Sequence, residues 1–279
     1  MGFFGSIYEN SVVKNLTINL DPETDGFRGN ITNNKFEFGA GVVTYELLQG
    51  AKIENVTTTG TLGSNSESQT VAGGNIGRLT HNGAGIATVA IPSSKSNTKK
   101  TSIINCTNKV NIWGSYTKAA GILGYVSPES YPNLSIGFVL IQNCRNEGNI
   151  NNSNSINPNS AGGTGGIVGW VGNADQYNCE IDGCENTGLV TRAEHSNINV
   201  DNGFGQIYGY RNGYVQIYKK LPVYARSDIQ VAPVFMSYNT NTNNSGFEYP
   251  NAPVVNMPIH LVMEDGRISL TEDINDAKY

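Results

Sequence analysis

The sequence predicts an all-β fold, a right-handed parallel β-helix (β-solenoid) with a β-rich cap at its C-terminal end. Three observations favour this class. Glycine is abundant, with 33 residues among 279, while only 15% of the residues are charged, which is unlike the composition of a helical protein. Apolar runs are only a few residues long and rich in β-branched side chains, as in short strands. Short motifs recur about every 40 residues, a period typical of solenoids and arrays.

The first recurring element is a pair of apolar residues bounded by glycine. Its clearest copies read GILG and GIVG, and the glycines favour tight turns between short strands. An apolar pair this short is consistent with a strand that turns sharply at both ends. We assign copies of this element to residues 2–5, 41–44, 74–77, 121–124, 166–169 and, in degenerate form, 206–209.

Two further elements follow the first and give the repeat its register. The second centres on a small apolar residue, and the third is a short β-branched segment four residues later, at 60–62, 110–112, 148–150 and 188–190. Three short strands per repeat fit the three faces of a β-helix, whereas a β-propeller blade of this length needs four longer strands. The small apolar residues of the second element are Leu16, Val56, Cys106, Cys144 and Cys184.

Two copies of the repeat resemble those of a known family. They read GILGY (121–125) with IQNCRNEGNI (141–150), and GIVGW (166–170) with IDGCENTGLV (181–190). These segments resemble GLUG-motif repeats, which occur in bacterial surface and adhesin-like β-helix proteins of the Bacteroidetes type. The resemblance extends over about residues 2–210. It implies a surface or secreted β-helix with an adhesive role, and it carries no catalytic residues to this chain.

Stacking of the repeats predicts a column of cysteines. Equivalent residues of successive repeats should lie about 4.8 Å apart. Cys106, Cys144 and Cys184 share their position with Leu16 and Val56, so we interpret them as small apolar core residues. A disulfide between neighbouring repeats is the alternative, since this spacing lies within the range of bridged cysteines. A metal site is not expected, because there is no Cys-x-x-Cys pair.

A second column consists of asparagines, two residues after each of these cysteines. Asn108, Asn146 and Asn186 stand at equivalent positions. Asparagine tolerates left-handed turn conformations, and stacked carboxamides can hydrogen-bond to one another. We therefore predict an asparagine ladder at a turn, with a structural role.

A third column follows the second glycine of the first element and supplies the candidate ligand-binding residues. The column is read as Ser6, Tyr45, Arg78, Tyr125, Trp170 and Tyr210, so four of its members are aromatic. If the column faces outward, it forms a ridge suited to stacking on sugar rings. If it faces inward or lies under a loop, the rings serve packing. The candidate binding residues are therefore Tyr45, Tyr125, Trp170 and Tyr210.

Motifs for catalysis, metals and cofactors are not found. The three histidines fit no zinc or nucleophile motif, and there is no phosphate loop. The β-helix architecture also includes polysaccharide lyases and hydrolases, which need grouped carboxylates on one face. The nearest group is Asp175, Glu180, Asp182 and Glu185, of which Asp182 and Glu185 are expected to be solvated. We expect no catalytic residue, metal or cofactor.

Two domains are expected, residues 2–220 as the repeat β-helix and residues 221–279 as a C-terminal β cap or appendage. In the second, Asp265-Gly266 between two apolar runs predicts a hairpin. The first motif begins at Gly2 without a preceding cap, so we expect this chain to be a fragment of a longer exported protein. Its expected location is extracellular or at the cell surface.

Charge and patterning limit the partners. A net charge of −5 argues against nucleic acid or an anionic membrane surface. No apolar run reaches the roughly 18 residues of a membrane span. Two function classes follow: a noncatalytic adhesin that binds a polysaccharide or a host surface glycoprotein, and a carbohydrate-active β-helix enzyme such as a lyase or depolymerase. A purely structural scaffold is also compatible with the sequence.

Overall fold

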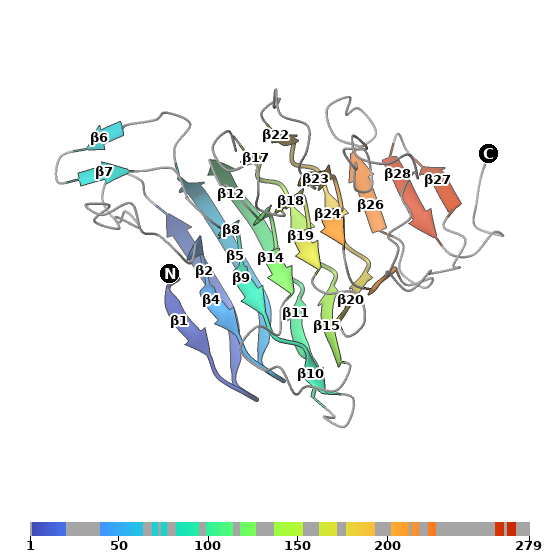
Figure 1. Cartoon of the computed structure of the whole chain (residues 1–279), viewed down its shortest axis with the longest axis horizontal. Helices are drawn as coiled ribbons and strands as arrows, with labels where there is room; N and C mark the ends of the chain where they lie inside the picture. Colours follow the sequence, from blue (N-terminus) through green and yellow to red (C-terminus); the bar gives the residue numbers. More distant parts are fainter. Residues whose placement is uncertain are drawn as a thin grey trace.

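Strands are the only regular elements in the part of the chain that the structure describes, and most of them pair in parallel (Figure 1). The all-β prediction is therefore confirmed, and the parallel sheets are consistent with a β-helix. The structure is a computed structural model. It describes residues 2–20, 40–63, 69–71, 74–76, 82–94, 99–113, 118–126, 137–152, 162–171, 177–192, 202–211, 214–217, 223–226, 260–264 and 267–271.

Two of the sheets are wholly parallel and lie next to each other along the chain. The five-stranded sheet consists of β3 (Ala40–Gly41), β8 (Asn82–Ala84), β13 (Lys118–Ala120), β18 (Gly162–Gly165) and β23 (Asn202–Gly205). The six-stranded sheet consists of β1 (Phe4–Ile7), β4 (Thr44–Leu47), β9 (Ala87–Ala90), β14 (Leu123–Val126), β19 (Val168–Val171) and β24 (Tyr208–Arg211).

A fifteen-stranded sheet takes up the rest of each repeat. Most of its pairs are parallel; β10 and the last two strands pair antiparallel. Its strands are β2 (Val12–Leu20), β5 (Lys52–Leu62), β10 (Ser93–Ser94), β11 (Thr101–Ile104), β12 (Thr107–Trp113), β15 (Gly137–Gln142), β16 (Arg145–Asn146), β17 (Ile150–Asn152), β20 (Tyr177–Asp182), β21 (Glu185–Asn186), β22 (Val190–Arg192), β25 (Tyr214–Ile217), β26 (Val223–Arg226), β27 (His260–Glu264) and β28 (Arg267–Thr271).

The pairing partner of each parallel strand is its counterpart one repeat away. Ile103 of β11 pairs with Ile53 on one side and with Ile141 on the other, and Ile141 pairs with Ile181. Each strand pair thus links residues that the repeat makes equivalent. We call the repeats units 1 to 6, formed by β1–β2, β3–β5, β8–β12, β13–β17, β18–β22 and β23–β26.

Units 1 to 5 each bend between two strand segments at a residue in the left-handed region of φ. Asn15, Asn55, Asn105 and Asn143 have φ between 51° and 57°, and Gly183 takes the same position with φ 60°. Asparagine and glycine are the residues that adopt this conformation at low cost. In unit 3 the bend lies between β11 and β12, and the other bends lie at the equivalent position of their units.

The asparagine ladder forms as predicted, but it lies within strands and not at the turn. Asn108, Asn146 and Asn186 are fully buried, and their backbones show no positive φ. Asn108 Nδ2 donates to Asn146 Oδ1 at 2.7 Å, and Asn146 Nδ2 donates to Asn186 Oδ1 at 2.7 Å. Thr58 Oγ1 continues the row by donating to Asn108 Oδ1 at 3.0 Å. The left-handed conformation belongs to the residues three positions earlier, Asn105, Asn143 and Gly183.

The first glycine of the repeat motif leaves room for this ladder, because it has no side chain. A Cβ added to Gly85 would collide with Asn108 Oδ1, one at Gly121 with Asn146 Oδ1, and one at Gly166 with Asn186. The carboxamide fills the space that a side chain would take. The two most conspicuous features of the repeat are therefore one packing contact inside each of units 3, 4 and 5.

Units 2 and 6 replace both partners together, whereas unit 1 keeps Gly2 and has Ile18 at the ladder position. In unit 2, Val42 stands where units 3, 4 and 5 have glycine, and the smaller Thr58 stands at the ladder position. Both are fully buried. In unit 6, Gln206 takes the glycine position and Ala225 aligns with Asn186. A larger residue on one side thus accompanies a smaller one on the other, as close packing requires.

Two assigned copies of the first element are corrected by the register. Phe4 pairs with Thr44, and Thr44 with Ala87, so the copy at 41–44 is shifted by one residue. Residues 74–77 are not a copy: β7 (Gly74–Ile76) pairs antiparallel with β6 (Gln69–Val71) in a separate hairpin. The third copy is residues 85–88, GIAT, which lacks the second glycine.

The parallel pairing continues beyond residue 220 before the arrangement changes. β26 pairs parallel with β21 of unit 5 and antiparallel with β28. β27 and β28 form the predicted hairpin, in which Leu261 pairs with Leu270 and Met263 with Ile268. The last parallel strand, β26, therefore pairs directly with a strand of the hairpin (Figure 1).

Alanine substitution of two glycines tests the glycine–asparagine contact. We expect Gly121→Ala to lower the free energy of unfolding by at least about 2 kcal/mol, because its methyl group collides with Asn146 Oδ1 and with the Gly166 carbonyl. Gly5→Ala is the matched control, since its Cβ would meet nothing within 4 Å. Denaturant unfolding of the two variants measures the difference. Equal stabilities would contradict the packing described.

Candidate functional site

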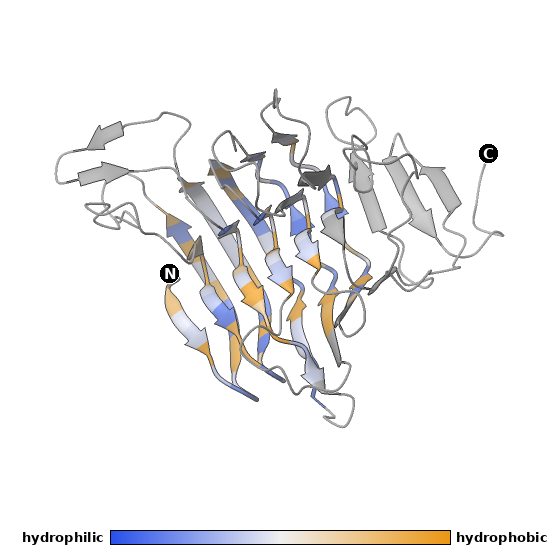
Figure 2. Ribbon diagram, in the orientation of Figure 1, coloured by the Kyte–Doolittle hydropathy of each residue, from blue (hydrophilic) through white to orange (hydrophobic). Residues whose placement is uncertain are grey.

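Three of the four candidate aromatic residues, Tyr45, Tyr125 and Trp170, belong to or pack against a small apolar cluster that is separate from the main core. Leu48, Val89, Ile91 and Tyr125 form this second cluster and are buried, with exposed fractions of 2–7%. Tyr45 and Trp170 are half-buried and pack against it. All of these residues belong to the six-stranded sheet or directly follow its strands. Figure 2 shows both hydrophobic and weakly hydrophilic residues along these strands.

The register places three of the four predicted aromatic residues in one row and leaves one out. Tyr125 pairs with Trp170, and Trp170 with Tyr210. Toward the N-terminus the row continues with Val89, Glu46 and Ser6, and Ser6 Oγ donates to Glu46 Oε2 at 3.0 Å. Tyr45 is not in this row, because the copy from which it was assigned is shifted by one residue and the row holds Glu46. Arg78 lies outside the described residues.

Tyr125 and Trp170 share a lysine that the sequence analysis missed. Their rings meet edge to face, with centroids 6.3 Å apart and planes at 64°. Lys118 Nζ lies 4.3 Å from the Tyr125 ring centroid and 4.5 Å from that of Trp170. Cation–π attraction favours this placement. Lys118 is the first residue of β13 in the neighbouring five-stranded sheet. The spacing of motifs within the aromatic row therefore could not predict its contact with the two rings.

Exposure separates these rings. Tyr125 is only 6% exposed, so its ring is packed and does not form part of an open ridge. Trp170 is half-buried and keeps part of its surface at the solvent. The position of Tyr210 in the row is given by its backbone alone. The row therefore offers one partly open indole beside an ammonium group, and a ligand role for the four aromatics stays a prediction.

The acidic group is held by ion pairs and an amide. Glu180 is 4% exposed and accepts from Lys100 Nζ at 2.8 Å. Asp182 was expected to be solvated but is only 7% exposed; its Oδ2 accepts from Gln142 Nε2 at 2.7 Å. Its Oδ1 is buried and has no hydrogen-bond partner among the described residues. Asp175 lies outside them.

Glu185 belongs to a different network of charged side chains, along β12, β16 and β21. Arg145 Nε lies 3.4 Å from Glu185 Oε2 and 3.2 Å from Glu147 Oε1. Lys109 Nζ extends the network to Glu147 at 3.2 Å. These charges join units 3, 4 and 5. No group of three or more potential ligands in the described ranges is arranged to hold a metal ion.

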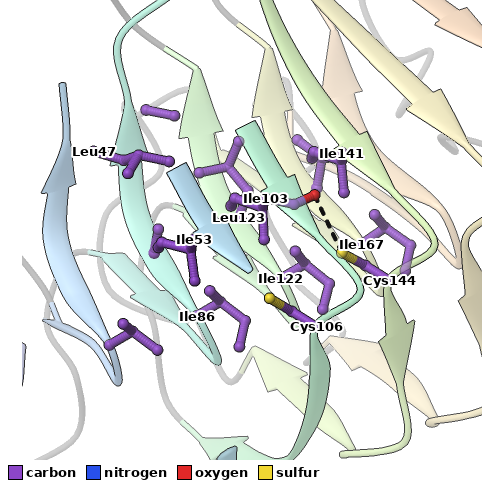
Figure 3. Close-up of a cluster of buried hydrophobic side chains, with 14 of the residues drawn as sticks. Leu47, Ile53, Ile86, Ile103, Cys106, Ile122, Leu123, Ile141, Cys144 and Ile167 are labelled. Atoms are coloured by element: carbon purple, nitrogen blue, oxygen red, sulfur yellow. Dashed lines mark hydrogen bonds between the residues drawn. The ribbon is translucent and has the colours of Figure 1, made fainter. Parts of the chain in front are cut away.

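The cysteines are core residues with free thiols. Cys106, Cys144, Cys179 and Cys184 are at most 1% exposed. Figure 3 shows Cys106 and Cys144 among the isoleucines of stacked strands, with the Cys144 thiol donating to the Ile103 carbonyl at 3.4 Å. The core interpretation is confirmed for the predicted column, and no disulfide is present among these four.

Burial also controls the acidity of the thiols. Removal from water raises the pKa of Cys144 well above its usual value and raises that of Cys179 as well. A hydrogen bond with Cys144 lowers the pKa of Cys106. Because the thiolate is the reactive form, the thiols of Cys144 and Cys179 are inert at neutral pH.

Comparison with known proteins gives one structural neighbour. No family model matches the chain, and no curated protein matches it. The neighbour is a crystal structure from Bacteroides ovatus of a protein provisionally described as an immunoglobulin A1 protease, with 19% identity and a TM-score of 0.42. The match covers 77% of this chain and 60% of the neighbour, so the chain spans less than two thirds of that protein.

Among the described residues, no helical segment has the length and apolar character that a membrane crossing demands.

Thiol labelling of the folded chain tests the placement of the cysteines. We expect iodoacetamide at pH 8 to modify the native thiols at least about 100-fold more slowly than the unfolded chain, because the thiols are buried and the raised pKa values of Cys144 and Cys179 keep them protonated. Mass spectrometry counts the labels. Rapid native labelling, or a bridge between Cys106 and Cys144, would overturn this assignment.

Proposed function

We propose that this chain is a right-handed parallel β-helix that acts as a noncatalytic, adhesin-like scaffold and binds glycans at the cell surface or outside the cell. The partner would be a polysaccharide or a host surface glycoprotein. Parallel pairing between strands one repeat apart supports the solenoid part of this proposal. The GLUG-like repeats support the adhesive part.

One observation supports glycan binding above the others, the contact of Trp170 and Tyr125 with Lys118. A partly open indole can stack on the apolar face of a sugar ring, and a neighbouring ammonium can donate hydrogen bonds to hydroxyl or carboxylate oxygens. The stacked strands hold the two rings in register, so the platform is rigid before a ligand binds. By register, Tyr210 extends the row beyond Trp170.

The residues that define the repeat are used for stacking, which also favours a scaffold. Gly121 makes room for Asn146, Asn143 forms the bend, and Cys144 fills the core. Each of these roles recurs in the neighbouring units. The side chains that differ from unit to unit, such as Trp170 and Lys118, are then the ones available for recognition.

A carbohydrate-active enzyme is the second candidate, and Asp182 favours it. A buried carboxylate oxygen without a hydrogen-bond partner is unusual in a protein and is found at catalytic centres. Glu180 is two residues away on the same strand, so both carboxylates belong to one face of the sheet. Reducing-sugar release that Asp182→Asn abolishes would favour this candidate over the adhesin.

Replacement of Trp170 tests glycan binding. On an array of polysaccharides and glycoprotein glycans, we expect the folded chain to bind and Trp170→Ala to weaken that binding by about tenfold or more, equivalent to roughly 1.4 kcal/mol. Trp170→Phe should retain part of the affinity, because a ring remains. Tyr8→Ala is the control: Tyr8 is 70% exposed and lies in unit 1, whereas Trp170 lies in unit 5.

Circular dichroism and thermal unfolding of each variant show whether it is folded. Binding by the unmodified chain that Trp170→Ala leaves intact would rule out this site. A folded chain that binds no glycan on the array would rule out the proposed function as well.

A further inference from the structure

The ion pair of Lys100 with Glu180 connects units that are not neighbours. In stacked repeats each unit contacts the next, so most side-chain bonds between units span about one repeat. Gln142 and Asp182, for example, are 40 residues apart. Lys100 leads into β11 of unit 3, whereas Glu180 lies in β20 of unit 5, 80 residues later. β15 of unit 4 lies between these two strands.

Unit 4 has no charged residue at the position that pairs with Glu180. Leu140 pairs with Glu180 on one side and with Ser102 on the other. Leu140 is half-buried and has an apolar side chain. The carboxylate of Glu180 is therefore neutralised across this strand and not by the residue that stacks on it.

The chain next to Lys100 is firmly held. Thr101 Oγ1 donates to the Ile91 carbonyl at 2.6 Å and accepts from the Gly50 amide at 2.9 Å. The Thr101 amide donates to Ser93 Oγ at 2.8 Å. All of these bonds are buried. Lys100 thus starts from a fixed point on units 2 and 3.

A second link fastens the same segment to unit 4. β10 pairs antiparallel with β15, and Ser93 lies opposite Phe138. The segment that ends in Lys100 therefore contacts unit 4 through β10 and unit 5 through the ammonium group. Three consecutive units are joined by this one stretch of chain.

Burial makes the pair energetically important at the Glu180 end. The Glu180 side chain is 5% exposed and the Lys100 side chain 46% exposed. A buried carboxylate without a counter-charge is strongly unfavourable, so loss of Lys100 leaves Glu180 stranded. An exposed ammonium that loses its partner is hydrated instead. The two ends of the pair should therefore respond differently to mutation.

We propose that Lys100 and Glu180 form a latch that couples unit 3 directly to unit 5. In a stack held by nearest-neighbour contacts alone, the terminal units open first and inner units follow one by one. The latch prevents unit 5 from separating while unit 3 stays folded, unless the ion pair breaks. Units 3, 4 and 5 then open as one cooperative block.

Native-state hydrogen exchange of the whole chain tests this latch. We expect Lys100→Met to accelerate exchange in β20 and β15 by about fivefold or more. We expect Glu180→Gln to accelerate exchange in β11 as well, although β11 is two units away. In the double variant the effects should be less than the product of the single effects, as expected for coupled residues.

Two further variants separate the latch from an ordinary ion pair. Lys109→Met breaks the pair of Lys109 with Glu147 between adjacent units, whose side chains are 48% and 30% exposed; we expect changes below about twofold. Lys100→Arg keeps the charge and should keep the protection. If Lys100→Arg exchanges as fast as Lys100→Met, the single effects simply multiply, or Glu180→Gln leaves β11 unchanged, the latch is ruled out.

Discussion

The carboxamide of a buried asparagine, seated where a glycine has no side chain, is the contact on which the rest of this structure depends. It recurs as Gly85 with Asn108, Gly121 with Asn146 and Gly166 with Asn186. Asn108 and Asn146 each donate to the next carboxamide along the stack, and all three carboxamides donate to the carbonyl two residues on, as Asn146 does to Gly148. A buried amide is costly unless its hydrogen bonds are made. One residue therefore fixes the separation of two sheets, the register of neighbouring units and the local path of the chain.

The other repeated residues follow from this arrangement. Once the units are in register, the residue directly after the left-handed bend faces the core. Val56, Cys106 and Cys144 are therefore interchangeable at that position. The same register brings side chains of different units together on the surface. Trp170 meets Tyr125 in this way, and the Glu180 of one unit comes within reach of a lysine two units earlier. Scaffold and candidate site are thus products of a single stacking rule, and the proposed latch is an exception to its nearest-neighbour character.

The sequence predicts the all-β class, the repeat period and the cysteine and asparagine columns, because the residues at those positions are alike in each unit. It fails where the likeness is accidental or lost. The sequence GNIG at 74–77 imitates the motif, but β7 belongs to a separate hairpin, and the true copy at 85–88 has Thr88 in place of the second glycine. Val42 hides the first glycine position of unit 2, which shifted Tyr45 into a row that holds Glu46. The contacts of Lys118 and Lys100 could not be predicted, because each joins side chains from different sheets or units that share no motif.

The most direct test of the stacking rule is the nuclear Overhauser effect between the side-chain amide protons of Asn146 and the α-protons of Gly121, measured in the isotopically labelled chain. The structure predicts cross-peaks to the α-protons of Gly121, beside which the carboxamide lies, and to those of Gly188, where an added Cβ would lie 2.8 Å from Asn146 Nδ2. It also predicts cross-peaks to the side-chain amides of Asn108 and Asn186, and slow exchange of these protons with water, since all three asparagines are fully buried. Side-chain amide protons of Asn146 that exchange rapidly with water and show no cross-peak to Gly121 would contradict the account.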